Sequence, residues 1–163
     1  MDGKLRNMAS IYIVKGDKML LLYRQGGRVV NDVWVGSAGG HFEEPELNDA
    51  RACVLRELQE ELGITGDALN NLRLRYVTLR RIKGELRQNY YFFADLKDGV
   101  DEKLSSDEGV TRWFPLGELP SLEMPFTSKY VIRHYLDVGC KTDKMYGGIA
   151  DGTGVVFTEL PEF

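Results

Sequence analysis

One short amphipathic helix, flanked on both sides by β-rich runs, constrains the fold of this chain more than any other feature. The helix is predicted from Asn48 or Asp49 to residue 62, because either side chain can accept a free backbone N–H at its first turn. Gly63 stands where helices often end, since glycine adopts positive φ without steric cost. Leucines at helical spacing predict its buried stripe: Leu55, Leu58 and Leu62.

The β-rich runs surround this helix without a steady strand–helix–strand alternation. A second helix is predicted over residues 128–138, a single helical turn over 115–119 and a terminal hairpin over 144–159. This order predicts an α+β sandwich with a mixed β-sheet, and not a doubly wound parallel fold. The predicted strands cover residues 8–14, 19–24, 33–37, 72–82, 86–96 and 110–114.

Composition sets the class of protein. The 163 residues suit a single domain over 1–163, and a net charge of −4 argues against a nucleic-acid polymer as partner. Cys53 and Cys140 make neither a disulfide framework nor a zinc site, which favours a reduced, intracellular protein. No apolar run resembles a signal peptide or a membrane span, so we expect a soluble cytoplasmic protein without a membrane partner.

The first helix carries an unusual acidic face. Glu57, Glu60 and Glu61 fall within an arc of about 100°, opposite the leucines. Carboxylates at i and i+4 repel each other, and acidic side chains near a helix C-terminus oppose the helix dipole. The face is either ordinary solvated surface or a site for a hard cation such as Mg²⁺, which binds carboxylate and phosphate oxygens. The helix alone leaves both interpretations open.

The surrounding residues resemble the Nudix box, the signature of the MutT-type Nudix hydrolases, with the pattern G-x5-E-x7-R-E-U-x-E-E-x-G-U, where U is aliphatic. Its second half matches residues 56–64, RELQEELGI, at every fixed position, and Gly40 and Glu46 are correctly spaced from each other. Two extra residues lie between Gly40 and Arg56, and we place them in the loop before the helix. An insertion within the helix would rotate its two faces apart. Glu46 is then the expected first box glutamate, with Glu43 and Glu44 as alternatives.

The resemblance implies a Nudix-like α/β/α sandwich and a set of site residues. Glu60 and Glu61 would bind Mg²⁺ or Mn²⁺, and Glu57 would be a further ligand or the base that activates water. The backbone carbonyl of Gly40 would supply another oxygen. Arg56, pointing off the acidic face, would pair with the loop glutamate Glu46. The catalytic residues implied in this way are Glu57, Glu60 and Arg56.

Substrate-binding candidates lie outside the box, and each has an ordinary structural alternative. Arg24 and Arg28 would reach phosphates from the end of the first hairpin, and His41 would line the phosphate site. Two residues would contact a base or the metal from the turn before the last central strand, Asp107 and Glu108. Tryptophans can stack on a base but are more often core, and this holds for Trp34 and Trp113.

The resemblance leaves three functions open. The first is Mg²⁺-dependent hydrolysis of a nucleoside triphosphate to the monophosphate and pyrophosphate, with oxidised nucleotides such as 8-oxo-dGTP as candidates. The second is hydrolysis of ADP-ribose, a dinucleoside polyphosphate or a nucleotide sugar. The third is a nucleotide-binding module without catalysis, which the intact run of mutually repelling carboxylates disfavours. In each case the partner is a small nucleotide.

Overall fold

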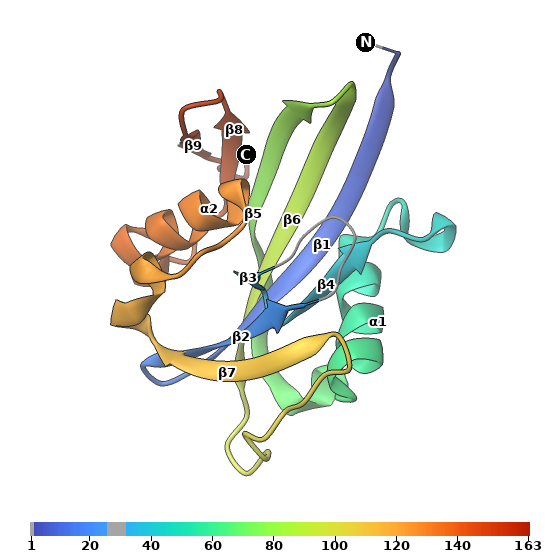
Figure 1. Ribbon diagram of the computed structural model, residues 1–163. Helices are drawn as coiled ribbons and strands as arrows, with labels where there is room; N and C mark the ends of the chain where they lie inside the picture. Colours follow the sequence, from blue (N-terminus) through green and yellow to red (C-terminus); the bar gives the residue numbers. More distant parts are fainter. Residues whose placement is uncertain (1, 26–31) are drawn as a thin grey trace.

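The computed structural model describes residues 2–25 and 32–163, and Figure 1 shows a mixed β-sheet between two helices. Within these residues the sheet has the order β3-β2-β1-β6-β5-β8-β9, with β4 paired to β1 and β7 paired to β2. The strands are β1 (Lys4–Lys15), β2 (Lys18–Arg24), β3 (Val33–Val35), β4 (Ala38–His41), β5 (Leu69–Ile82), β6 (Glu85–Leu96), β7 (Gly109–Pro115), β8 (Tyr146–Ala150) and β9 (Val155–Glu159).

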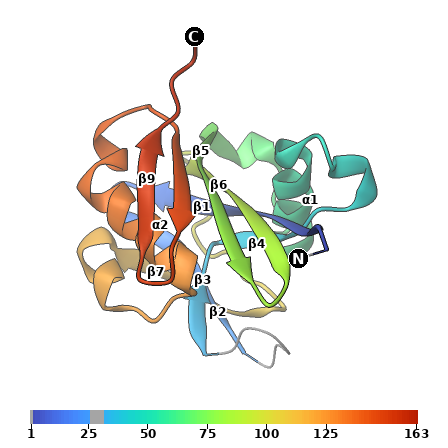
Figure 2. The same ribbon diagram turned by 90° about the horizontal axis from the view of Figure 1, so that it is seen from above.

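The two α-helices lie on opposite faces of the sheet, as Figures 1 and 2 show from two directions. They are α1 (Ala50–Leu62) and α2 (Phe126–Asp137). The predicted α/β/α sandwich with a mixed sheet is therefore confirmed. The connections contain four short 3-10 helices within the described residues: η1 (Glu44–Glu46), η2 (Gly66–Ala68), η3 (Leu116–Ser121) and η4 (Gly139–Lys141).

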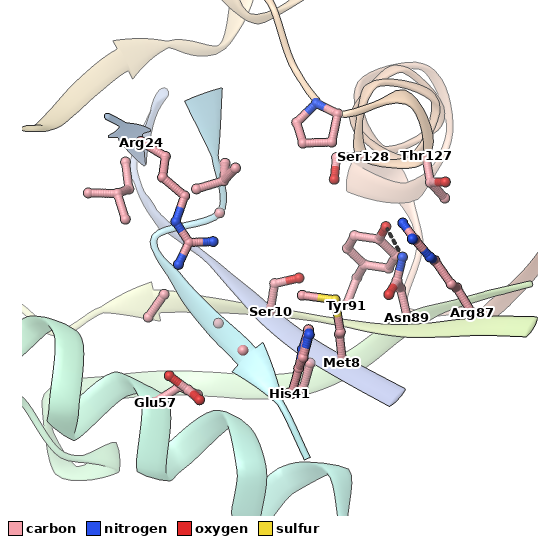
Figure 3. Close-up of a pocket in the computed structure, with 18 of the residues that line it drawn as sticks. Met8, Ser10, Arg24, His41, Glu57, Arg87, Asn89, Tyr91, Thr127 and Ser128 are labelled. Atoms are coloured by element: carbon pink, nitrogen blue, oxygen red, sulfur yellow. Dashed lines mark hydrogen bonds between the residues drawn. The ribbon is translucent and has the colours of Figure 1, made fainter. Parts of the chain in front are cut away.

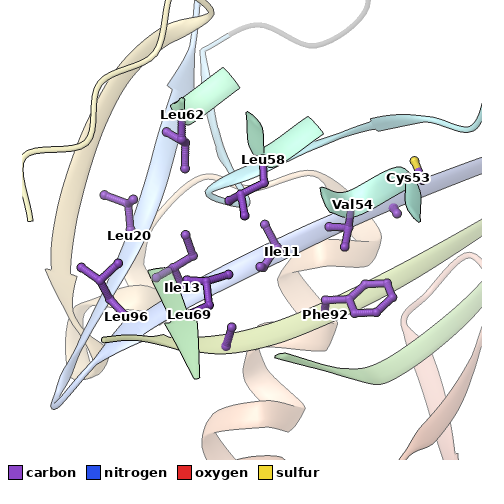
Figure 4. Packing of buried hydrophobic residues seen from close by; sticks show 13 residues of the cluster. Ile11, Ile13, Leu20, Cys53, Val54, Leu58, Leu62, Leu69, Phe92 and Leu96 are labelled. Carbon is purple, nitrogen blue, oxygen red and sulfur yellow. The ribbon is translucent and has the colours of Figure 1, made fainter. Parts of the chain in front are cut away.

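Each face of the sheet buries its own core, because successive residues of a strand point to opposite faces. On the α1 side, Ile11 and Phe92 pack with Val54 and Leu58 of the helix (Figure 4). On the α2 side the core is rich in aromatic residues. Its fully or nearly fully buried members include Tyr12, Tyr76, Tyr91, Phe93, Val131 and Ile132.

The long strand β1 divides the sheet into two halves. One edge pairs in parallel with β6 from Lys4 to Val14. The other edge is shared, because β4 pairs with its middle residues, Met8 to Ile11, and β2 with its last residues. Ser37 fills the junction: its hydroxyl accepts from the Ile13 N–H at 2.9 Å and donates to the Leu20 carbonyl at 2.6 Å. Ser37 thus connects β1 and β2 at the point where the pairing of β1 changes from β2 to β4. Beyond this point β4 and its glycines lie towards α1.

Several element boundaries differ from the prediction. The glycine-rich segment after residue 37, which lies outside the predicted strands, forms β4, because pairing with β1 outweighs the weak strand preference of glycine. Helix α2 begins at Phe126, directly after Pro125, and not at residue 128. On α1 the buried stripe includes Cys53 and Val54, whereas Leu55 is only partly buried. The terminal hairpin expected over residues 144–159 is present as β8 and β9, and β1 and β2 form a further hairpin around residues 15–18.

Among the described residues, the longest apolar helical stretch is too short to cross a lipid bilayer.

Candidate active site

Helix α1 holds its acidic residues at fixed positions because both of its ends are capped. The Asp49 carboxylate accepts from the Ala52 N–H at 3.0 Å. Gly63 has φ of 69°, a left-handed conformation that favours glycine, and its N–H donates to the Gln59 carbonyl. With Leu58 fully buried beneath the helix, Glu57 and Glu61 lie on the side that faces a cavity.

Arg56 links the helix to the loop before it. Its guanidinium donates to both carboxylate oxygens of Glu46, with Nη2 and Oε2 3.0 Å apart. Glu46 is buried, and this pairing lowers its pKa to about 2. Glu43, the alternative, lies 3.7 Å from Arg56 with a largely exposed side chain, and Glu44 is exposed. The loop carboxylate held by Arg56 in this structure is therefore that of Glu46.

Arg56 also contacts the acidic face, contrary to the expectation that it points away. Its Nη1 donates to Glu57 at 2.9 Å and to Glu60 at 3.1 Å, so two carboxylates share one nitrogen. The Glu60 side chain is 56% exposed and does not line the cavity, whereas that of Glu57 is 12% exposed. A long arginine side chain can bend along the helix surface, which a projection of Cα positions does not capture.

Glu57 and Glu61 form a closely interacting pair of carboxylates. Burial, together with the neighbouring Glu57, raises the pKa of Glu61 to about 8. Gly40 of β4 lies directly against the Glu57 carboxylate, and a Cβ at this position would collide with it. The Gly40 carbonyl oxygen, which we expected to be a metal ligand, lies 3.8 Å from the Cys53 thiol. The absence of a side chain at Gly40 thus lets the strand and the carboxylate approach each other, and a metal contact by its carbonyl stays a prediction.

The donor set suits a hard divalent cation. In the part of the chain that the structure describes, no group of three acidic, histidine or cysteine side chains converges closely enough to enclose a metal. However, the one guanidinium of Arg56 lies within ion-pair distance of four carboxylates on α1 and its loop, and so neutralises them only in part: Glu43, Glu46, Glu57 and Glu60. Oxygen-only ligands with excess negative charge are what Mg²⁺ and Mn²⁺ bind in proteins.

A cavity of about 540 Å³ extends from the acidic pair across the glycines of β4 to the first turn of α2 (Figure 3). This volume suits a nucleotide-sized ligand. Figure 3 shows Glu57 at one end of the cavity and Arg87 and Asn89 at the other, with His41 and Met8 between them. Thr127 and Ser128 of α2 border the end near Arg87.

Three of the predicted substrate-binding residues line this cavity. Arg24 lies near the acidic end, 3.6 Å from Glu108, which also lines the cavity. His41 accepts from Arg6 at 2.9 Å when its Nε2 is unprotonated. Burial and the nearby Arg6 lower the pKa of His41, so its neutral form is favoured. Arg28 lies outside the described residues.

Three other predicted substrate-binding residues lie elsewhere. The Trp34 ring packs edge-on against Phe114, with ring centroids 4.6 Å apart, and against Tyr23. It therefore belongs to the core, as does the partly buried Trp113, whose Nε1 donates to the Glu102 carbonyl. Asp107 does not line the cavity, because the turn before β7 directs its neighbour Glu108 inwards instead.

The residues of the sheet that line the far end of the cavity were not predicted from the sequence. They alternate along two neighbouring strands: Arg80 on β5, and Arg87, Asn89 and Tyr91 on β6. The i, i+2 spacing was visible in the sequence. It could not indicate a site, because the strand that lies beside β6 was unknown.

A mixed sheet between two helices, with two glutamates of one helix facing a nucleotide-sized cavity, is the arrangement expected of an enzyme that acts on phosphate compounds. Comparison with known families agrees with this class: the family model described as the NUDIX domain matches residues 4–135. The chain therefore belongs to the Nudix family and is a hydrolase of phosphorus-containing anhydrides.

Solved structures of the same fold include a MutT protein from Bacillus halodurans, with a TM-score of 0.65 and 23% identity over 96% of this chain and 99% of that one. A MutT protein from Methanosarcina mazei Go1 has a TM-score of 0.68 and 19% identity, covering 87% of this chain and 99% of that one. A binary complex of an Ap4A hydrolase from C. elegans has a TM-score of 0.66 and 19% identity, over 84% and 99%. A comparison with curated protein sequences gave no match.

Proposed function

We propose that this protein hydrolyses the diphosphate linkage of a small nucleotide-like substrate, with Mg²⁺ or Mn²⁺ held by Glu57, Glu60 and Glu61. The observation that carries the proposal is the partly buried pair Glu57 and Glu61 at one end of a nucleotide-sized cavity. A divalent ion there would remove the repulsion between the carboxylates. The Glu60 carboxylate lies next to this pair, because Arg56 Nη1 donates to both Glu57 and Glu60.

The bound ion would neutralise phosphate charge and lower the pKa of a coordinated water. Glu57 and Glu61 lie at the cavity wall, where a carboxylate can take the proton of an attacking water. Arg56, tied to Glu46, orients Glu57 and Glu60. Arg24 adds a positive charge near the acidic end, where phosphate groups would lie.

Two substrate classes are consistent with this site. One is a nucleoside triphosphate, including oxidised forms such as 8-oxo-dGTP, cut to the monophosphate and pyrophosphate. The other is a nucleoside diphosphate linked to a further group, as in ADP-ribose, a dinucleoside polyphosphate or a nucleotide sugar. The relatives in fold include proteins named for each class, MutT proteins and an Ap4A hydrolase. The length of the cavity beyond the acidic end favours a substrate that continues past its diphosphate.

A panel assay tests the proposal. The protein is incubated with Mg²⁺ and members of both classes, and release of phosphate, pyrophosphate and nucleoside monophosphate is measured. Pyrophosphate from a deoxynucleoside triphosphate supports the first class, and cleavage restricted to ADP-ribose or dinucleotides supports the second. Tight binding of one member without any cleavage would contradict the proposed hydrolysis.

Substitutions test the residue assignment with the best substrate of the panel. We expect Glu57→Gln and Glu60→Gln each to lower turnover by at least about 100-fold while the protein remains folded. Glu44→Gln, an exposed acidic residue of η1, is the matched control and should keep wild-type turnover. Turnover of Glu60→Gln near that of the wild type would remove Glu60 from the metal-binding set.

A further inference from the structure

The far end of the cavity carries three arginines that the proposed hydrolysis does not use. Arg6 on β1 lies opposite Arg87 on β6, and Arg87 lies opposite Arg80 on β5. All three line the cavity, so their side chains project from the same face of the sheet. We call them the arginine row.

The charge of the arginine row is only partly balanced. Glu85 lies 3.2 Å from Arg87 and 4.0 Å from Arg6. The guanidinium of Arg80 lies over the Phe126 ring, 4.7 Å from its centroid, and Arg6 also donates to the neutral His41 ring. Among the described residues, Glu85 is the one carboxylate in ion-pair distance of the row, which leaves two positive charges.

Such a row costs stability unless it has a ligand. Like charges directly opposite each other on neighbouring strands are destabilising. Three half-buried guanidiniums across three adjacent strands therefore do not arise from packing alone. Two unbalanced charges match a phosphate monoester, which carries a charge of about −1.5 to −2 at neutral pH, better than they match a single carboxylate.

The position of the row relative to the acidic pair sets the size of the ligand. Gly40, which touches Glu57, pairs with Ala9 of β1, and Arg6 lies three residues further along this strand. At the rise of a β-strand this is ~10 Å. A diphosphate bound at Glu57 would thus have room for a sugar or similar group before the row is reached. Figure 3 shows this arrangement, with Glu57 and Arg87 at opposite ends.

A buried polar group without a hydrogen-bond partner lies beside the arginine row. Asn89 lines the cavity, and its side-chain oxygen is buried without a hydrogen-bond partner, while its nitrogen donates to the Tyr91 hydroxyl at 3.4 Å. A buried acceptor without a donor costs free energy. A hydroxyl or amino group of the ligand, positioned between the diphosphate and the row, would satisfy it.

We propose that the arginine row binds a second phosphate group of the substrate, separate from the diphosphate that is cleaved. The inference rests on the proposed function and narrows its substrate class to nucleotide-like diphosphates with a phosphate monoester at their far end. Asn89 contacts the part of the substrate that connects the two phosphate sites.

Pairs of compounds that differ by one phosphate monoester test this inference. NADPH and NADH form one pair, and coenzyme A and dephospho-coenzyme A form another; all four contain a diphosphate linkage. Binding is measured by titration calorimetry in EDTA at constant ionic strength, so the result does not depend on hydrolysis. We expect the phosphorylated member of at least one pair to bind about 10-fold tighter or more, because charge-assisted hydrogen bonds to arginine are strong.

Two arginine variants then locate the effect. Arg87→Gln should abolish the preference for the phosphorylated member and leave the affinity of the other member unchanged. Arg81→Gln removes the same charge from the same sheet, but Arg81 is exposed and follows Arg80, so its side chain projects from the opposite face. This control should keep the preference, and Arg80→Gln replaces Arg87→Gln if the latter does not fold.

The outcomes separate the two proposals. Equal affinities within both pairs for the wild type, or equal losses in Arg87→Gln and Arg81→Gln, would overturn the arginine row as a phosphate site. Absence of Mg²⁺-dependent cleavage across the nucleotide panel would instead overturn the proposed hydrolysis and would leave the binding result intact.

Discussion

The ion pair between Arg56 and Glu46 is the residue-scale contact on which the acidic site depends. It joins the loop after β4 to the second turn of α1, and the same guanidinium reaches Glu57 and Glu60. Glu46 is 6% exposed, so its carboxylate is removed from water and depends on Arg56 for its charge. The loss of Arg56 would leave the buried Glu46 carboxylate without its ion pair, which is costly in proteins.

This contact predicts a pH-dependent contribution to stability. The folded-state pKa of Glu46 is lowered from 4.5 to about 2, so its contribution is fully present above pH 4.5 and is lost as the pH falls towards 2. We expect Glu46→Gln to reduce the free energy of unfolding by about 3 kcal/mol at pH 7, and by progressively less below pH 4. Urea unfolding at pH 7 and at pH 3 measures the difference.

Glu44→Gln is the control for this prediction, because Glu44 lies in the same 3-10 helix but is exposed. It should change the unfolding free energy by less than about 0.5 kcal/mol at either pH. A loss for Glu46→Gln that is the same at pH 7 and pH 3 would show that packing, and not the charge of Glu46, provides the stabilisation.

At the scale of elements, the N-terminal cap of α1 holds the acidic face in place. The sequence left Asn48 and Asp49 as equal candidates, since both have suitable side chains. The structure selects Asp49, whose carboxylate accepts from the Ala52 N–H at 3.0 Å. The negative charge of Asp49 also interacts favourably with the positive end of the helix dipole.

We therefore expect Asp49→Ala to lower the unfolding free energy by about 1 kcal/mol, the usual cost of a lost cap. Asn48→Ala, one position earlier and exposed, should have little effect. Thermal and urea unfolding of the two variants, measured side by side, check the assignment. Equal losses in both would place the start of α1 elsewhere.

Elements that depend on residues close together in the sequence were predictable. Elements that depend on pairing between residues far apart in the sequence were not. Helix α1 and the β1–β2 and β8–β9 hairpins follow from side-chain periodicity and turn residues close in sequence. Strand β4 depends on β1, about 30 residues away. The same difference applies to the site: its acidic end lies on one helix and was predicted, whereas the arginine row requires the parallel pairing of β1 with β6.

At the scale of the whole molecule, the two ends of the cavity have opposite charge. The chain has a net charge of −4, and much of the local excess at the acidic end lies on α1. The fold holds Glu57 and Glu61 together against β4, so part of its folding free energy opposes their repulsion. A bound divalent cation would remove this cost in the folded state and would find no such site in the unfolded chain.

Mg²⁺ should consequently raise the melting temperature. At a concentration of about ten times its dissociation constant, a ligand specific for the folded state adds about 1.4 kcal/mol. For a domain of this size, that corresponds to a shift of about 3–6 °C. Circular dichroism melts in Mg²⁺ and in EDTA, with ionic strength matched by KCl, measure the shift.

The double variant Glu57→Gln/Glu61→Gln should change the melting temperature in different ways without and with Mg²⁺. Without metal, at a pH above the pKa of about 8 of Glu61, it should melt at a higher temperature than the wild type, because two neutral amides then replace two charged, repelling and partly buried carboxylates. With Mg²⁺ it should show no further rise, because the ligands are gone. An equal Mg²⁺ shift in the double variant and the wild type would mean that the cation acts on general surface charge, and the glutamates of α1 would then not be its site.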